Sequence, residues 1–163
     1  KLIKGPDIFL EVVKKIYERN KSTKVVLSGT RRQYIITNLS NMGIPFIYVR
    51  DKAKGHGRKN QVEGYFKPGS NVVVIEDLIS TGGSSLKAVT ALKEAGADVL
   101  GMMAIFTYDF PLAQKNFEEA NIQLHTLSDY HHLLEQAVQS RSISLSEKQL
   151  LSEWRAAPSV WGR

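Results

Sequence analysis

The sequence predicts an α/β fold in which a mainly parallel sheet of about five strands is flanked by helices. Segments rich in β-branched and apolar residues alternate with amphipathic segments of helical length, as they do in parallel α/β proteins. The chain has 163 residues, 42% of them hydrophobic, which is enough for one core and short for two ordinary domains. No internal repeat or linker divides the chain. We therefore expect one domain over residues 1–163.

The first half of the chain predicts two helices and two strands. A helix is expected from near Asp7, because the stretch "DIFLEVVKKIYERN" places apolar residues at helical spacing after a Gly-Pro pair. The apolar segments 24–28 and 44–49 are expected to be strands, with a weaker helical segment from Gly29 to about Met42 between them. Residues 50–70 have little apolar periodicity, which predicts a long flexible loop with room for a short hairpin.

The second half predicts three more strands and four helices. Strands are expected at 72–75, 98–108 and 122–127, where apolar and β-branched residues gather. Helices are expected at 84–95 and 111–120, and Gly96 is expected to end the first of them. Two further helices follow at the C-terminal end. The second of these begins with a capping-box pattern, formed by Ser144 and Glu147.

The composition excludes several classes of function. The 22 Lys and Arg residues against 16 Asp and Glu residues favour anionic partners, but no long basic run or aromatic array predicts binding of nucleic acid. The chain has no cysteine, which excludes disulfides, thiol catalysis and Cys-ligated metals. No apolar run approaches the roughly 18 to 20 residues that cross a bilayer, and no signal-peptide pattern opens the chain. A cytoplasmic protein without a membrane partner is expected.

The segment 76–85 joins two acidic residues to a turn rich in glycine and hydroxyl groups. Its "STGGSSLK" stretch matches neither a P-loop nor a dinucleotide-binding motif, since it lacks their spacing of glycine and lysine. Backbone N–H groups of residues 80–85, with a helix N-terminus behind them, suit one phosphate group. Glu76 and Asp77 can accept hydrogen bonds from vicinal hydroxyls or attract a cation complex. A sugar phosphate such as ribose 5-phosphate fits this pattern; the alternative is an ordinary turn after two solvated carboxylates.

A second segment, "YVRDKAKGHGRKNQVEG" at residues 48–64, is strongly basic and almost free of apolar residues. Such a segment contributes little to a core, so a solvated charged loop is one interpretation. The other is a loop that closes over an anion, because Gly55 and Gly57 flank His56 and allow a close approach. Lys54 and His56 would then neutralise a departing diphosphate or donate a proton to it.

These two segments resemble known motifs. "VVVIEDLISTGGSS" looks like the motif that binds 5-phosphoribosyl 1-diphosphate (PRPP) in the type I phosphoribosyltransferases, and the basic loop looks like the catalytic loop of orotate phosphoribosyltransferases. The resemblance covers roughly residues 44–161. It implies that Lys54 and His56 are catalytic and that Ser80 also lies near orotate. The residues that it implies for PRPP binding are Arg50, Lys54, His56, Glu76, Asp77, Leu78, Ile79, Ser80, Thr81, Gly82, Gly83 and Ser84.

The resemblance also implies a reaction. Members of the family transfer ribose 5-phosphate from PRPP to orotate, which gives orotidine 5'-phosphate and diphosphate in de novo pyrimidine biosynthesis. The cofactor implied is Mg²⁺, carried by the diphosphate of PRPP rather than by direct protein ligands. The family also implies a homodimer in which the loop 50–60 reaches the neighbouring active site. A PRPP-binding regulatory or non-catalytic paralogue, or a phosphoribosyltransferase for another nucleobase, are the alternatives.

The chain departs from the family pattern in several places. Family members begin with a hood over the acceptor base, which is expected to be absent or truncated before Lys1. Asp51 follows Arg50 where some members have a Lys, so Lys52 is not expected to act directly. In the segment 28–34, "SGTRRQY", the two arginines either contact phosphate or lie at the surface. Tyr108 stands near the place of an Arg that faces orotate in some members.

The remaining histidines, tryptophans and methionines predict structural roles. His125, His131 and His132 are expected at the surface or at a helix cap rather than in a metal site. Trp154 and Trp161 are expected to anchor the last helix to the body of the protein. Met102 and Met103 are expected in the core.

Overall fold

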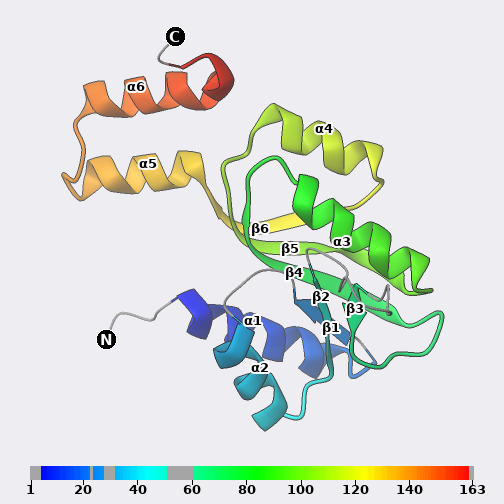
Figure 1. Ribbon diagram of the computed structural model, residues 1–163. Coiled ribbons are helices and arrows are strands. Elements are labelled where there is room, and N and C mark those ends of the chain that lie inside the picture. The colour runs from blue at the N-terminus through cyan, green and yellow to red at the C-terminus, as the bar shows by residue number, and fades with distance from the viewer. Residues whose placement is uncertain (1–4, 23, 28–31, 51–60, 162–163) are drawn as a thin grey trace.

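The computed structural model describes residues 5–22, 24–27, 32–50 and 61–161. Its helices and strands follow the order expected for an α/β protein (Figure 1). The elements are α1 (Gly5–Arg19), β1 (Lys24–Leu27), α2 (Arg32–Asn41), β2 (Phe46–Val49), β3 (Val62–Glu63), β4 (Asn71–Ile79), α3 (Gly83–Glu94), β5 (Asp98–Thr107), α4 (Pro111–Glu119), β6 (Leu124–Asp129), α5 (Tyr130–Gln139), α6 (Leu145–Ala156) and a short 3₁₀ helix (Pro158–Val160).

The described strands form one sheet in the order β3-β2-β1-β4-β5-β6. All neighbouring pairs are parallel except β2 and β3, which pair antiparallel through Tyr48 with Glu63 and Val49 with Val62. The sheet therefore has six strands where about five were expected. The additional strand, β3, has only two residues, too few to show a period of two in the sequence. It lies in the segment where a short hairpin was considered.

The core occupies both faces of the sheet. In Figure 1, α1 and α2 lie on one side of the sheet and α3 and α4 on the other. One buried cluster includes Val74, Leu92 and Phe117, and a second includes Leu10, Leu39 and Ile75. Adjacent residues of a strand point to opposite faces, so a strand covered on both sides is apolar throughout. This is why the central strands read as continuous apolar runs.

Strand β4 is longer than its apolar run. The sequence predicts a strand at 72–75, but β4 continues to Ile79 and so contains both acidic residues of the motif. The extension is due to the neighbouring strand, because Glu76, Leu78 and Ile79 pair with residues of the ten-residue β5. Acidic residues are depleted in strands, so the sequence alone ends the strand too early.

Local signals at the helix ends are confirmed. Gly96 has a φ of 87° directly after the last turn of α3, and its N–H donates to the carbonyl of Lys93 at 3.0 Å. The capping box of α6 is present, since the Ser144 side chain accepts a bond from the Glu147 N–H and the Glu147 carboxylate accepts one from the Ser144 N–H. Hydrogen bonding to Ser144 lowers the pKa of the Glu147 carboxyl group.

The two C-terminal helices pack on each other and extend away from the helices that cover the sheet (Figure 1). Trp154 of α6 makes ring contacts with Tyr108, Phe110 and Tyr130, with ring centroids 5.5 to 5.8 Å apart. The predicted anchoring role of Trp154 is thus confirmed. Trp161 is 45% exposed, so its predicted anchoring role is not supported. Met102 is fully buried and Met103 packs against the second core cluster, as expected.

Asp129 caps the N-terminus of α5, and its removal is expected to destabilise the protein. Its side chain accepts a hydrogen bond from the backbone N–H of His132 at 2.9 Å, and the His132 ring also lies 2.9 Å from the carboxylate. Asp129→Ala should lower the free energy of unfolding by about 1 kcal/mol, while Asp129→Asn should retain most of the cap. Urea unfolding of the three proteins measures this; equal losses in Asn and Ala variants would contradict it.

The cap also has a predictable dependence on pH. The backbone hydrogen bond from His132 lowers the pKa of Asp129 below its ordinary value of 3.8. The stabilisation by the carboxylate is therefore present above about pH 4 and is lost as the pH falls through the lowered pKa. The hydrogen bond to Asp129 raises the pKa of His132 above 6.5. The stabilisation that the protonated His132 ring contributes is therefore fully present below pH 6.5 and is lost as the pH rises through the raised pKa.

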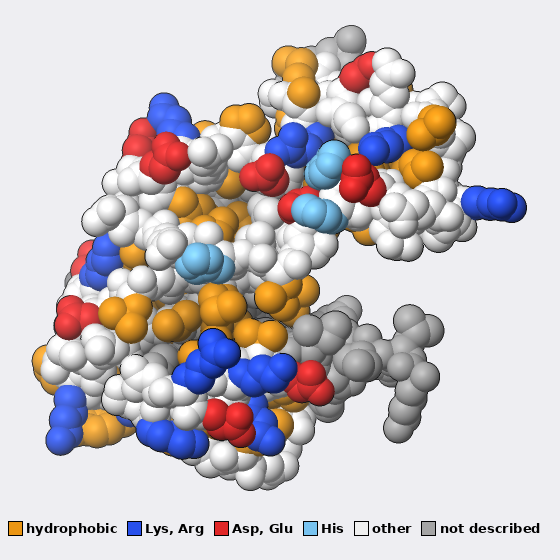
Figure 2. All heavy atoms as spheres, turned by 180° about the vertical axis from the view of Figure 1, so that it is seen from behind, with side chains coloured by type: hydrophobic (Ala, Val, Ile, Leu, Met, Phe, Trp, Pro, Cys, Tyr) orange, Lys and Arg blue, Asp and Glu red, His pale blue; other side chains and the backbone are white. Residues whose placement is uncertain are grey.

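Hydrophobic side chains gather on the back of the molecule, as Figure 2 shows. Two exposed apolar residues of the sheet are Leu100 of β5 and Leu127 of β6, which are 55% and 49% exposed. Within the described ranges, no helix is both long enough and apolar enough to cross a membrane.

Candidate active site

The turn between β4 and α3, residues 80–82, together with Gly83 at the start of α3, is called the phosphate loop below, after the role that the sequence predicts for it. It leaves the carboxyl end of β4, near the middle of the sheet, where parallel α/β sheets place ligands. Gly82 has a φ of 78° and is the N-cap residue of α3, so no side chain caps that helix, and the first turn of α3 has no acidic residue. Uncapped N–H groups at a helix N-terminus attract anions. The local geometry is that of an anion-binding turn.

The end of β5 fixes the start of this loop. The backbone N–H of Tyr108 donates to the carbonyl of Ile79 at 3.0 Å, and the Thr107 hydroxyl donates to the same carbonyl at 3.4 Å. The Thr107 hydroxyl also accepts a bond of 2.8 Å from the N–H of Asp109. Thr107 is 6% exposed, and its buried hydroxyl thus donates one hydrogen bond and accepts another within the protein. The carbonyl of Ile79, directly before Ser80, is therefore fixed to the end of β5 by two hydrogen bonds.

Helix α4 lies against the other end of the loop. A Cβ atom added to Gly82 would lie 2.6 Å from Cε2 of Phe117, whose side chain is 4% exposed. The side-chain amide of Asn116 donates to the carbonyl of Thr81 at 2.8 Å. The glycine at position 82 is thus required both by its φ and by the close approach of Phe117.

Arg155 connects the last helix to the same edge of the sheet. Its Nε donates to the Tyr108 carbonyl at 2.9 Å, and its Nη2 contacts both the carbonyl and the carboxylate of Asp109. Tyr108 and Asp109 follow β5 directly, and Asp109 has a φ of 54°. Arg155 therefore fixes the chain where it turns away from β5. This is next to the N–H of Tyr108, which bonds to the Ile79 carbonyl at the start of the phosphate loop. Tyr108 stacks on Phe110 with ring centroids 5.3 Å apart, so its ring belongs to this aromatic cluster.

The two acidic residues of the motif lie in different environments. Both belong to β4 rather than to the turn that follows it. Glu76 is 6% exposed, whereas Asp77 lies at the surface. Successive side chains of a strand point to opposite faces, so the two carboxylates lie on opposite faces of the sheet. Asp77 is therefore the carboxylate that a ligand in solution can reach directly.

Arg50 lies at the same edge of the sheet as the phosphate loop. It follows β2, which is separated from β4 by β1, and all three strands are parallel. With about 4.8 Å between neighbouring strands, two strand spacings are roughly 10 Å. The guanidinium Nη2 forms an ion pair with Glu63 of β3, and Nε is buried without a hydrogen-bond partner in the described part of the chain. This ion pair with Glu63 fixes the direction in which the Arg50 guanidinium points.

Other predicted site residues lie outside the described residues. These include the catalytic candidates Lys54 and His56, together with Gly29, Thr30 and Arg31 after β1. Arg32 is described only as the first residue of α2. Of the predicted set, the structure brings together Glu76 to Ser84 on one strand and turn, and places Arg50 on the same edge.

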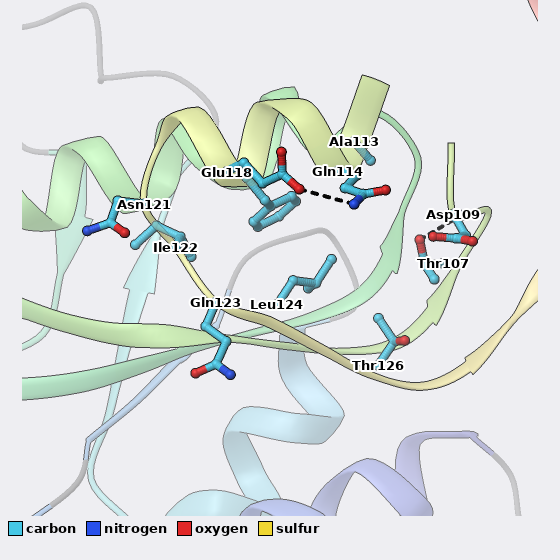
Figure 3. Close-up of a pocket in the computed structure, with 11 residues that line it drawn as sticks. Thr107, Asp109, Ala113, Gln114, Glu118, Asn121, Ile122, Gln123, Leu124 and Thr126 are labelled. Atoms are coloured by element: carbon cyan, nitrogen blue, oxygen red, sulfur yellow. Dashed lines mark hydrogen bonds between the residues drawn. The ribbon is translucent and has the colours of Figure 1, made fainter. Parts of the chain in front are cut away.

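A separate open pocket of about 560 Å³ lies between α4 and the strands β5 and β6 (Figure 3). Its lining includes Thr107, Asp109, Gln114, Phe117, Glu118 and Thr126. Gln114 and Glu118 are joined by a hydrogen bond of 3.0 Å across one turn of α4. None of the predicted PRPP-binding residues that the structure describes lines this pocket. It touches the phosphate loop only indirectly, through Phe117.

The histidines do not gather into a metal site within the described ranges. No group of three or more Asp, Glu and His side chains there is arranged to hold a metal ion. His131 and His132 are exposed and interact with Glu135 and Asp129, respectively. The expected surface position of this pair is confirmed, whereas the residue that caps α5 is Asp129, which accepts a bond from the His132 N–H.

The sequence did not predict the roles of Asn116, Arg155 and Glu63. All three lie within residues 44–161, the part of the chain that resembles the family, but the resemblance assigned no role to any of them. Their partners lie 35 residues away for Asn116 and 13 residues away, from 50 to 63, for Glu63.

Comparison with known proteins identifies relatives with one common name. No protein-family model matches the chain. The orotate phosphoribosyltransferase of Porphyromonas gingivalis is 54% identical over 121 residues, which are 74% of this chain and 58% of the relative. That of Cytophaga hutchinsonii is 52% identical over 137 residues, or 84% of this chain and 65% of the relative.

A solved structure has the same fold. The orotate phosphoribosyltransferase of Aeropyrum pernix superposes with a TM-score of 0.64 at 21% identity, over 81% of this chain and 75% of that chain. The chain spans about three fifths of the length of the curated relatives it matches. The identity of 54% and 52% to these curated relatives shows that the chain belongs to the orotate phosphoribosyltransferase family.

Proposed function

We propose that this protein transfers ribose 5-phosphate from PRPP to orotate, in de novo pyrimidine nucleotide biosynthesis. The bond between C1 of the ribose and diphosphate breaks, a bond from C1 to a ring nitrogen of orotate forms, and the proton of that nitrogen is released. The products are orotidine 5'-phosphate and diphosphate. The observation that carries the proposal is the 54% identity to an orotate phosphoribosyltransferase over 74% of this chain.

The phosphate loop and the acids before it bind the ribose 5-phosphate part in this proposal. N–H groups and hydroxyls of residues 80–84 hold the 5-phosphate at the uncapped N-terminus of α3. Asp77, which is exposed, accepts hydrogen bonds from the ribose hydroxyls. Glu76 contributes negative charge from the buried side of β4 and so favours the positive charge that develops on the sugar. Ser80 also lies near orotate.

The basic residues act on the leaving diphosphate. Arg50, Lys54 and His56 neutralise the negative charge that develops there, and Lys54 or His56 supplies a proton. Glu63 keeps the Arg50 guanidinium at the sheet edge before the ligand binds. Closure of the loop that carries Lys54 excludes water, which limits hydrolysis of PRPP.

Several further parts of the proposal come from the family. Mg²⁺, carried by the diphosphate of PRPP rather than by direct protein ligands, would supply additional positive charge there. The protein forms a homodimer in which the loop 50–60 reaches the neighbouring active site, and it acts in the cytoplasm. Residues 1–163 form one phosphoribosyltransferase domain.

A turnover assay tests the function directly. The purified chain is incubated with PRPP, Mg²⁺ and orotate, and the loss of orotate absorbance is followed while diphosphate release is measured in parallel. We expect equal amounts of orotate consumed and diphosphate formed. Uracil and adenine in place of orotate serve as controls and should not react.

Two outcomes would contradict the proposal. If PRPP binds but no acceptor is consumed, the chain is a PRPP-binding protein rather than an enzyme. If uracil or adenine reacts and orotate does not, the acceptor is wrong, although the reaction class stands.

A further inference from the structure

Helix α4 contacts the phosphate loop although none of its residues belongs to the PRPP-binding motif. The Nδ2 amide of Asn116 donates a hydrogen bond to the carbonyl oxygen of Thr81 at 2.8 Å. The next residue, Phe117, packs against Gly82 closely enough to exclude a side chain there. One face of α4 therefore makes both a polar and an apolar contact with two successive loop residues.

The polar contact determines the direction of an N–H group. The carbonyl of Thr81 and the N–H of Gly82 belong to the same peptide group, and the described chain has no cis peptide bond. In a trans peptide these two groups point in opposite directions. Because Asn116 holds the carbonyl toward α4, the N–H of Gly82 points away from α4, to the side of the loop that α4 does not cover.

The peptide group between Thr81 and Gly82 needs the hydrogen bond from Asn116 because its second residue is a glycine. Glycine adopts positive and negative φ almost equally well, so the peptide before Gly82 can rotate with little steric cost. A rotation by half a turn would present the Thr81 carbonyl, rather than the Gly82 N–H, to an anion. The observed φ of 78° at Gly82 goes together with the carbonyl bonded to Asn116.

We propose that Asn116 is a positioning residue for the phosphate site, whose side-chain amide fixes the Thr81–Gly82 peptide so that the Gly82 N–H faces the 5-phosphate of PRPP. The inference rests on the proposed function, which supplies the phosphate ligand. Asn116 does not itself touch the ligand in this role. An aspartate at position 116 would have the same shape but no donor, and its negative charge would repel both the Thr81 carbonyl and a nearby phosphate.

Calorimetric titration of three ligands tests this role. The wild-type chain, Asn116→Ala and Asn116→Asp are titrated with PRPP and Mg²⁺, with ribose 5-phosphate, and with diphosphate and Mg²⁺. Asn116→Ala should weaken binding of PRPP and ribose 5-phosphate by about 3- to 10-fold, the effect of one hydrogen bond. Asn116→Asp should weaken both by more. Binding of diphosphate, which lacks the 5-phosphate, should stay the same.

Gln114→Ala is the matched control, since Gln114 lies on the same helix and its side chain bonds to Glu118 rather than to the loop. It should leave all three affinities unchanged. The melting temperature of each variant is measured alongside, so that a general loss of structure is seen separately.

The outcomes separate this inference from the proposed function. If the wild-type chain binds PRPP and the Asn116 variants bind it equally well, the positioning role is wrong and the function stands. If the variants lose affinity for all three ligands equally with a lowered melting temperature, Asn116 is merely structural and the inference is overturned. If the wild-type chain does not bind PRPP, the proposed function fails and this inference fails with it.

Discussion

Gly82→Ala is expected to destabilise the protein by about 2 to 4 kcal/mol and to weaken PRPP binding by at least about tenfold. Two effects add at this position. A φ of 78° is unfavourable for alanine, and the new Cβ would lie 2.6 Å from the buried ring of Phe117. Either the ring or the loop must move, and movement of the loop misplaces the N–H groups that bind phosphate in the proposed function. Urea unfolding and calorimetric titration with PRPP measure the two consequences.

Gly43→Ala separates the effect of backbone conformation from that of the contact with Phe117. Gly43 has a φ of 65°, but a Cβ there would meet no atom within 4 Å. The substitution should cost about 1 to 2 kcal/mol and leave PRPP binding unchanged. Gly82→Ala could instead lose no more free energy of unfolding than Gly43→Ala and bind PRPP like the wild type. The contact of Phe117 with Gly82 would then contribute neither to stability nor to PRPP binding.

Lys54→Ala is expected to lower kcat for orotate consumption by about 10²- to 10³-fold while the unfolding curve stays the same. In the proposed reaction Lys54 neutralises the charge that develops on diphosphate as the bond to C1 breaks. This interaction is stronger in the transition state than in the bound substrate, so kcat falls and not only the affinity for PRPP. Steady-state assays with both substrates varied measure kcat and KM separately.

Lys52→Ala is the matched control in the same loop. It removes the same charge two residues away, next to Asp51, where the chain departs from the family pattern. Its effect on kcat should be much smaller than that of Lys54→Ala. Equal losses in the two variants would mean that the loop acts through its overall charge, and the assignment of Lys54 as a catalytic residue would be wrong.

Signals within a few residues were read correctly from the sequence. The end of α3 at Gly96, the capping box of Ser144 and Glu147, and the buried Met102 all follow from local residue type and spacing. A glycine after a helix relieves backbone strain wherever it occurs, and a capping box forms within four residues. Tertiary contacts are not needed to predict such features.

The extent of the strands depended on their neighbours. β4 runs on through Glu76 and Asp77 because it pairs with the long strand β5, and β3 exists because two residues pair with the end of β2. A strand gains its hydrogen bonds from another segment of the chain, so its length is not a property of its own residues. The resulting difference in exposure between Glu76 and Asp77 could not be predicted from an acidic pair in the sequence.

The sequence by itself determined the order of helices and strands apart from β3 and, through two resembling motifs, the family, and it predicts a phosphate site in the loop of residues 80–84. The tertiary structure decided what holds that loop in place. Asn116 bonds to Thr81 across 35 residues, and Arg155 bonds to Tyr108 across 47. Each contact joins elements that meet only when the helices pack on the sheet. Residue types at positions 116 and 155 cannot specify such partners, because the partners are chosen by the packing of the whole fold.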